Sequence, residues 1–159
     1  MTDHAGTTPF GCGGRGRDFP PFDEKRRETI INFFNNDTTY FPGHLGLKIA
    51  DLRQGYARLE VMNDKHLMQA GGVMHGGASF GMADTATAVA LMTIYPLNTM
   101  LLTIEMKINY LEPIPAGLVT AESYVLRSSK RSAYAEIDIW AAGKLAARAS
   151  TTYMIRPAA

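Results

Sequence analysis

The sequence predicts an α+β domain in which an antiparallel sheet of about five or more strands packs against one long helix. Small and apolar residues run from Gly76 to Tyr95 and are stopped only by Pro96, which predicts a long buried helix over 76–95. Segments with the two-residue period of β-strands lie on both sides of this run. At 159 residues the chain is long enough for one domain with a substantial core.

Alternating side chains and turn residues place the strands. Before the helix, strands are expected at 45–49 and 56–62. After it, four more are expected at 100–110, 118–127, 132–140 and 144–155. Turns rich in proline and glycine, at 113–117 and 142–143, separate the later strands.

The N-terminal part has a different composition from the rest. Residues 1–22 are rich in glycine, proline and threonine, which predicts a flexible arm, and 23–159 are expected to form the single domain. A helix is predicted at 23–35, where Asp23 and Glu24 suit the first turn. Residues 40–44 are expected to form a loop.

The predicted central helix carries one carboxylate, Asp84, near its middle. The glycines and alanines around Asp84 supply little side-chain bulk, so another element is expected to approach this helix closely. A charged group in such surroundings is costly unless it is paired or hydrogen-bonded. Asp84 is therefore a candidate site residue.

The start of the helix also indicates a site. Met74, His75, Gly76 and Gly77 include none of the usual N-cap residues, so the first backbone N–H groups are expected to lack a side-chain cap. Such groups attract an anion or a polarised carbonyl oxygen. N–H donors and a carboxylate on one helix suggest attack on a carbonyl.

These residues carry a family resemblance. His75-Gly76-Gly77, followed by Phe80 and by Asp84 in the segment 83–86, resembles the signature of hotdog-fold acyl-CoA thioesterases of the PaaI-like, phenylacetate-pathway type. Residues 103–113 resemble the family's strand that ends in Y-L-x-P, and the likeness extends over about 40–155. It implies a sheet curled around the central helix, and hydrolysis of an acyl-CoA to a free acid and coenzyme A.

The resemblance also implies roles for single residues. Asp84 would be the general base for water or the nucleophile, and this choice stays open. The Gly76 N–H would contact the thioester oxygen, and His75 would help to shape the pocket. Gln69 lies where many relatives carry an asparagine near the substrate carbonyl, and Thr103 matches a hydroxyl residue that helps to place the water in some relatives.

Further residues are candidates for substrate binding. Gly77, Phe80 and Thr85 belong to the matching segment of the helix. The basic residues around a predicted turn could anchor the phosphates of coenzyme A, although basic turn residues are also common on solvated surfaces; these are Arg127, Lys130 and Arg131. Phe80, Tyr40, Phe41 and Tyr95 could line an aromatic or a medium-chain acyl pocket.

Composition argues against several other functions. The net charge is +1 with scattered basic residues, so no nucleic-acid footprint is visible, and the longest apolar run is too short to span a bilayer. Cys12 is the only cysteine, which favours a reducing, cytoplasmic setting. The four histidines show no paired ligand spacing, so neither a metal nor another cofactor is expected, apart from coenzyme A within the substrate.

Helix geometry predicts a homodimer with shared sites, perhaps doubled to a tetramer, because Gly76 and Asp84 are too far apart along one helix to meet. Two other functions are considered. A non-catalytic acyl-CoA or acyl-carrier binding module could use the same fold. A hydratase or dehydratase is suggested by the segment 41–44, which ends in His44, but the central helix lacks the glutamate that such enzymes use.

Overall fold

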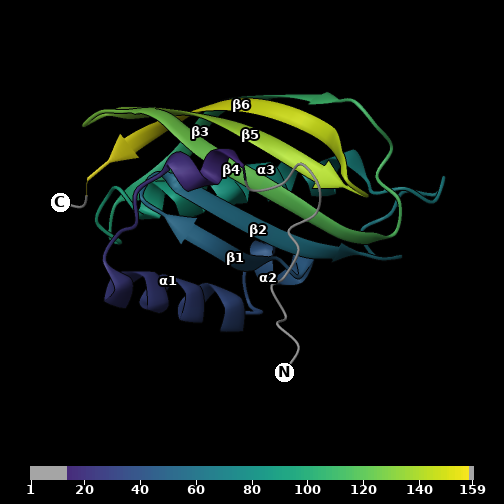
Figure 1. The fold of residues 1–159 in the computed structure, drawn as a ribbon, viewed down its shortest axis with the longest axis horizontal. Helices are drawn as coiled ribbons and strands as arrows, with labels where there is room; N and C mark the ends of the chain where they lie inside the picture. Colours follow the sequence, from purple (N-terminus) through teal and green to yellow (C-terminus); the bar gives the residue numbers. More distant parts are fainter. Residues whose placement is uncertain (1–13, 158–159) are drawn as a thin grey trace.

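The computed structural model describes residues 14–157, and within them six strands form one antiparallel sheet that curves around a long helix, α3 (Gly76–Met92) (Figure 1). The spatial order of the strands is β1-β2-β4-β5-β6-β3. Their bounds are β1 Lys48–Arg53, β2 Tyr56–Asn63, β3 Met100–Tyr110, β4 Gly117–Ser128, β5 Ser132–Ala141 and β6 Lys144–Arg156. The predicted α+β class is confirmed.

The four strands after the helix, and the strand predicted at 56–62, lie within one residue of their predicted bounds. The turn between β5 and β6 is built from Ala142 and Gly143, whose φ values are 49° and 75°. Glycine enters this left-handed region without steric cost, so Gly143 marks the turn as predicted.

The segment before β1 departs from the prediction. Residues 40–44 were expected to be a loop, which is wrong, and the strand expected at 45–49 is confirmed only for its last two residues. Phe41–Leu45 instead form a short helix, α2, and β1 begins only at Lys48. Pro42 suits the first turn of this helix, and Gly46 ends it with φ at 75°, so the local residues explain the helix once tertiary packing supports it.

Helix α1 (Glu24–Asn36) lies one residue later than predicted, because Asp23 is its cap: the Asp23 carboxylate accepts a hydrogen bond from the Arg26 N–H at 2.8 Å. Helix α3 ends at Met92 and not at the predicted Tyr95, and Arg26 of α1 lies at this end. Its guanidinium donates to the carbonyl oxygens of Met92, at 2.6 Å, and of Tyr95. A cation at this position satisfies carbonyls that the helix leaves without partners.

The core lies between α3 and the inner face of the sheet. Alanines on the buried side of α3, among them Ala83, Ala86 and Ala90, are fully buried, as are Leu59 and Ile137 of the facing strands. Small side chains allow the helix backbone to approach the sheet closely, as expected from the sequence. This packing leaves one face of α3 uncovered, and Asp84 and Thr85 are half-buried on that face.

The opposite face of the sheet carries a short 3-10 helix, η1 (Arg15–Asp18), in front of the strands in Figure 1. Phe19, which follows it, stacks on Tyr56 with ring centroids 5.8 Å apart. Tyr56 and Tyr124 donate hydrogen bonds to the buried carboxylate of Glu122. Of the predicted arm over 1–22, residues 1–13 lie outside the described part of the chain.

Candidate active site

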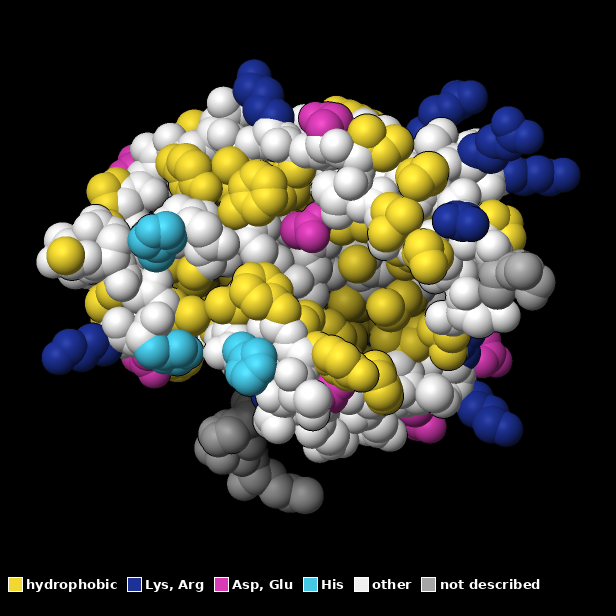
Figure 2. Space-filling view, turned by 180° about the vertical axis from the view of Figure 1, so that it is seen from behind, with side chains coloured by type: hydrophobic (Ala, Val, Ile, Leu, Met, Phe, Trp, Pro, Cys, Tyr) yellow, Lys and Arg dark blue, Asp and Glu magenta, His cyan; other side chains and the backbone are white. Residues whose placement is uncertain are grey.

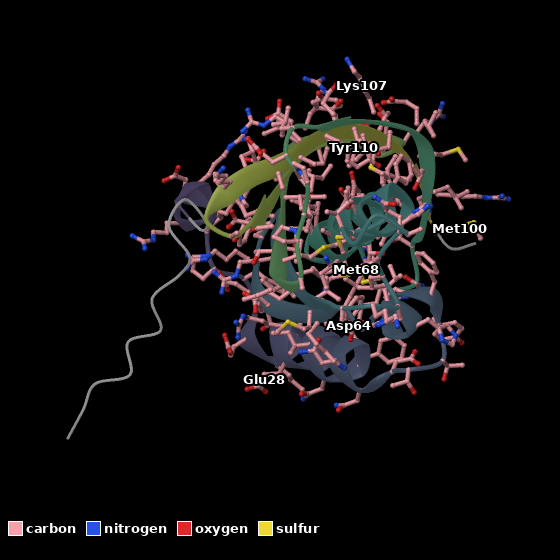
Figure 3. The ribbon with its side chains drawn as sticks, turned by 90° about the vertical axis from the view of Figure 1, so that its right-hand side faces the viewer. Glu28, Asp64, Met68, Met100, Lys107 and Tyr110 are labelled. Carbon is pink, nitrogen blue, oxygen red and sulfur yellow. The ribbon has the colours of Figure 1, made fainter. Side chains whose placement is uncertain are left out.

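The loop before α3 is tightly held at one end of the molecule, which Figure 3 views directly, with Met68 and Tyr110 labelled. The N–H of His75 donates to the Leu67 carbonyl at 2.8 Å, and the N–H of Met74 donates to the Ile114 carbonyl at 2.9 Å. The Gln69 side chain accepts from the Gly71 N–H at 2.6 Å. These bonds fix where the first turn of α3 begins.

The start of α3 is capped, which corrects the expectation of a bare N-terminus. His75 is the N-cap, and its Nδ1 accepts a hydrogen bond from the Gly77 N–H at 2.9 Å. A neutral imidazole nitrogen can take the place of the usual hydroxyl or carboxylate oxygen, which a search for Ser, Thr, Asp and Asn misses. Among the described residues, the Gly76 N–H has no hydrogen-bond partner, so it remains available as a donor.

Two clefts flank this first turn. The first, here called the Tyr110 cleft, has a volume of about 390 Å³, and the second, the Phe41 cleft, about 380 Å³. The Tyr110 cleft is lined by Gln69, Val73, Met74, Gly76, Ser79 and Tyr110 together with residues 111–114. The Phe41 cleft is lined by Phe41, Leu45, His66, Leu67, Met68, His75, Gly77 and Ala78. Gly76 and Gln69 therefore share one cleft, whereas His75 and Gly77 face the other.

Tyr110 holds the wall of its cleft in place and was not among the predicted site residues. Its hydroxyl donates to the Gly76 carbonyl at 2.8 Å, and partial burial raises its pKa. A Cβ on Gly76 would lie 3.1 Å from this hydroxyl, so a side chain larger than hydrogen is poorly accommodated. Its position at the end of a strand, before a proline turn, is the feature of the sequence that could have indicated this role.

Asp84 is held by two hydroxyl groups from neighbouring strands. Thr103 Oγ1, on β3, donates to Asp84 Oδ1 at 2.7 Å. The Tyr153 hydroxyl, on β6, donates to the same oxygen at 2.6 Å and lies 2.9 Å from the Asp84 backbone carbonyl. Thr103 was a predicted site residue and Tyr153 was not. The carboxylate is thus oriented by neutral donors, without an ion pair among the described residues.

Asp84 and the Gly76 N–H cannot meet within one chain. They lie eight residues apart on one helix. At 1.5 Å per residue the separation along the axis is about 12 Å, which an aspartate side chain does not cover.

The uncovered face of α3 is apolar and hollowed. Figure 2 shows hydrophobic side chains gathered around a hollow on this side of the molecule, with an acidic side chain among them. Phe80 is 39% exposed here, and Phe41 packs so closely on α3 that a Cβ on Gly81 would come within 2.8 Å of its ring. Phe80 and Phe41 therefore border the helix face that carries Asp84 and Thr85.

The predicted basic turn lies at the other end of the molecule. Arg127, Lys130 and Arg131 are exposed, and Arg156 at the end of β6 joins them, because the Ile155 N–H bonds to the Arg131 carbonyl. Basic side chains gather at this end in Figure 2. Lys130 lines a cleft of about 360 Å³ together with Tyr95. Within one chain these residues are remote from Gly76, at the opposite end of α3.

Among residues 14–157, no group of three or more His, Cys, Asp or Glu side chains is arranged to hold a metal ion. No helix there combines the length and the apolar character needed to cross a membrane.

A curved antiparallel sheet wrapped around one helix, with a hydrogen-bonded carboxylate on the open face of that helix, defines a protein of the hotdog class. Residues 71–147 match the family model described as the thioesterase superfamily. The chain is 30% identical over 131 residues to a Saccharolobus solfataricus protein provisionally named an esterase, covering 82% of this chain and 79% of that protein. The chain belongs to the thioesterase superfamily, a family of hydrolases.

Further similarities agree with this assignment. A Thermus thermophilus structure of the phenylacetic acid degradation protein PaaI is 29% identical, with a TM-score of 0.66, over 72% of this chain and 96% of that one. A thioesterase family protein from Silicibacter pomeroyi shares the fold, with 22% identity and a TM-score of 0.75, over 84% of this chain and 99% of that one. A 1,4-dihydroxy-2-naphthoyl-CoA hydrolase of Listeria monocytogenes is 26% identical over 95 residues, covering 60% of this chain and 77% of that enzyme. The PaaI-like resemblance is confirmed.

Proposed function

We propose that the chain is an acyl-CoA thioesterase in which Asp84 carries the hydrolysis. One observation supports this most strongly: the Asp84 carboxylate is fixed by Thr103 and Tyr153 on an open, apolar face of the central helix. Such a carboxylate can accept a proton from water or attack a carbonyl carbon directly. Similarity to an enzyme named as a naphthoyl-CoA hydrolase supports a coenzyme A thioester as the substrate.

In the proposed reaction, the Gly76 N–H donates to the thioester oxygen, where negative charge develops in the transition state. Water attacks the carbonyl carbon while Asp84 accepts its proton, the C–S bond breaks, and the thiolate of coenzyme A is protonated. Alternatively, the Asp84 carboxylate attacks the carbonyl carbon first, and the C–S bond breaks with release of coenzyme A. Water then hydrolyses the mixed anhydride to the free acid and restores Asp84. Neither route needs a metal, since a carboxylate activates water unaided, so added chelator should leave the rate unchanged.

The proposed site is shared between two subunits. Because Asp84 does not reach its own Gly76, a second copy with its α3 antiparallel would bring its Asp84 beside the first copy's Gly76. The same arrangement would bring its Arg127, Lys130 and Arg131 towards that end, where they could bind the phosphates of coenzyme A. The uncovered face of α3 and the edge strand β3 are the surfaces that support this homodimer, which could double to a tetramer.

Other residues that were predicted to contact the substrate line one of the two clefts or lie on the open face of α3. Gln69 shares the Tyr110 cleft with Gly76, and the free hydrogens of its amide could approach the thioester oxygen or the water. The Phe41 cleft offers apolar walls for an acyl group, and Phe80 and Thr85 lie on the face that this group would cross. A cytoplasmic setting is proposed because coenzyme A chemistry here requires no disulfide and Cys12 is the only cysteine.

The experiment that tests this proposal measures thiol release from a panel of aryl and aliphatic acyl-CoAs, with the parent chain and with Asp84→Ala. We expect turnover by the parent chain and a large loss in the variant. The alternative is a non-catalytic binding module, which the same fold permits. Saturable binding of acyl-CoA by the parent chain, with no thiol released from any member of the panel, would favour that alternative.

A further inference from the structure

Tyr153 lies at the centre of the Asp84 contacts and has no assigned role. Its side chain is 2% exposed, and its hydroxyl is within hydrogen-bond distance of both the carboxylate and the backbone carbonyl of Asp84. Thr103 is its direct partner in the register between β3 and β6. The two hydroxyl groups therefore reach Asp84 from adjacent positions on paired strands.

Both hydroxyl groups converge on one carboxylate oxygen. Thr103 and Tyr153 each bond to Oδ1, at 2.7 and 2.6 Å, and no hydrogen bond to Oδ2 is found among the described residues. The second contact of Tyr153 is to the backbone carbonyl of Asp84, so the same hydroxyl group links the side chain of Asp84 to the backbone of Asp84. One buried hydroxyl thus restricts both the rotamer of Asp84 and the plane of its carboxylate.

We propose that Tyr153 is a positioning residue that immobilises Asp84 through Oδ1 and leaves Oδ2 as the reacting oxygen. This inference rests on the proposed thioesterase function of Asp84. A preorganised base loses little conformational freedom on reaching the transition state, so its orientation contributes to kcat.

Tyr153 keeps its hydroxyl proton at the pH of an assay and therefore remains a hydrogen-bond donor. Burial, and next the hydrogen bond to Asp84, raise the pKa of Tyr153 far above the ordinary tyrosine value, so the hydroxyl keeps its proton. Charged side chains in the middle of the strands packed against α3 belong to the outer face of the sheet, because they alternate with the residues that face the helix; these are Arg58, Glu60, Glu105, Lys107, Glu122, Glu136, Asp138 and Arg148. On the other elements at α3, the titratable groups are His44 on α2 and His75 at the N-cap.

The test replaces only the hydroxyl, in Tyr153→Phe, and measures kcat, KM and melting temperature. Loss of a hydrogen bond to a charged group should reduce kcat by about tenfold or more with little change in KM. A residue that served packing alone would lower the melting temperature, while kcat per folded molecule would stay at the parent value.

Tyr134→Phe is the matched control, since Tyr134 is on the neighbouring strand β5, is 37% exposed and undergoes the same chemical change. It should leave all three quantities unchanged. Thr103→Val removes the other donor to Oδ1 and should lower kcat with little change in KM, which covers the case of a poorly folded Tyr153 variant. Normal kcat in folded Tyr153→Phe, measured while Asp84→Asn is inactive, would overturn the positioning role. A fully active Asp84→Asn would instead overturn the proposed function itself.

Discussion

At the scale of single residues, Asp84 combines features that rarely occur together in a purely structural aspartate. It lies on a helix of small and apolar residues, on the face that the sheet leaves uncovered, and it is oriented by neutral hydroxyl groups. The two hydroxyl groups orient the carboxylate through Oδ1, and no hydrogen bond to Oδ2 is found among the described residues. This environment suits a base or a nucleophile, as the proposed function requires.

Asp84→Asn should therefore reduce kcat by about 100-fold or more, the scale of a lost general base. The amide keeps the shape of the side chain but removes the negative charge, so KM should change far less than kcat. Steady-state kinetics on the best acyl-CoA of the panel, with melting temperature and mass measured on the same preparation, provide the test. A folded Asp84→Asn protein with near-normal turnover would contradict the catalytic assignment.

At the scale of elements, η1 packs on the outer face of the sheet through specific contacts. Arg15 lies over the Tyr124 ring, 4.5 Å from its centroid, and forms a 3.0 Å ion pair with Glu136. Gly16 is buried against Tyr56, where a Cβ would lie 2.4 Å from the ring. The segment consequently covers the buried carboxylate of Glu122 from the solvent side, and glycine is required at the point of closest approach.

Gly16→Ala should displace η1 and lower the stability of the domain by about 1–3 kcal/mol, the cost of overpacking a close contact. Gly14→Ala is the matched control, because a Cβ at Gly14 meets nothing within 4 Å and its φ of −64° is acceptable to alanine. Urea unfolding of both variants measures the difference. Equal stability of the two proteins would show that η1 does not contribute to the fold.

The tyrosines around Glu122 make the domain sensitive to alkali. Burial, together with Glu122, raises the pKa of Tyr56 and of Tyr124 far above the ordinary tyrosine value of about 10. A group whose pKa is raised on folding stabilises the folded state below its unfolded pKa and loses that contribution as the pH rises above it. The free energy of unfolding should thus fall above pH 10. Urea titrations at pH 9 and 11 test this, and Tyr56→Phe should flatten the slope; an equal slope in both proteins would argue against it.

At the scale of the whole molecule, two exposed surfaces support the proposed homodimer. The open face of α3 carries exposed and half-buried apolar residues, and the edge strand β3 exposes Ile104 at 61%. Exposed apolar surface and unpaired strand edges are often covered by a partner. The distance between Gly76 and Asp84 on one helix supports the same proposal from the chemistry.

Two inactive variants should therefore complement each other. Asp84→Ala lacks the carboxylate, and Gly76→Val blocks the N–H donor because its side chain meets Tyr110. Random mixing gives hybrid dimers in which one of two sites is intact, so unfolding and refolding the two together should restore about a quarter of the parent activity. Sedimentation measures the assembly in parallel. Full activity in a monomer, or no recovery in confirmed hybrid dimers, would rule out the shared site.

Much of the site could be predicted from local pattern. Asp84 and Gly76 were recognisable because a carboxylate and a run of glycines interrupt an otherwise apolar helix, and Thr103 because of a family motif. Tyr110 was overlooked although its place before a proline turn was a signal. Tyr153 had no such signal, since a tyrosine in a strand has the same local signature whether it packs in a core or donates to a distant carboxylate. The capping role of His75 was missed for a similar reason, because that role depends on the orientation of its imidazole ring.

By itself, the sequence determined the α+β class, the start of the long helix, the bounds of the later strands, and the presence of a carboxylate on a helix with a glycine-rich start. These properties depend on periodicity and on residues a few positions apart, which the chain specifies locally. Only the tertiary structure decided which hydroxyl groups hold Asp84, that Phe41–Leu45 form a helix, and that Arg26 binds the carbonyls at the end of α3. These contacts join segments separated by up to 69 residues, and such contacts exist only after the sheet has brought its strands together around the helix.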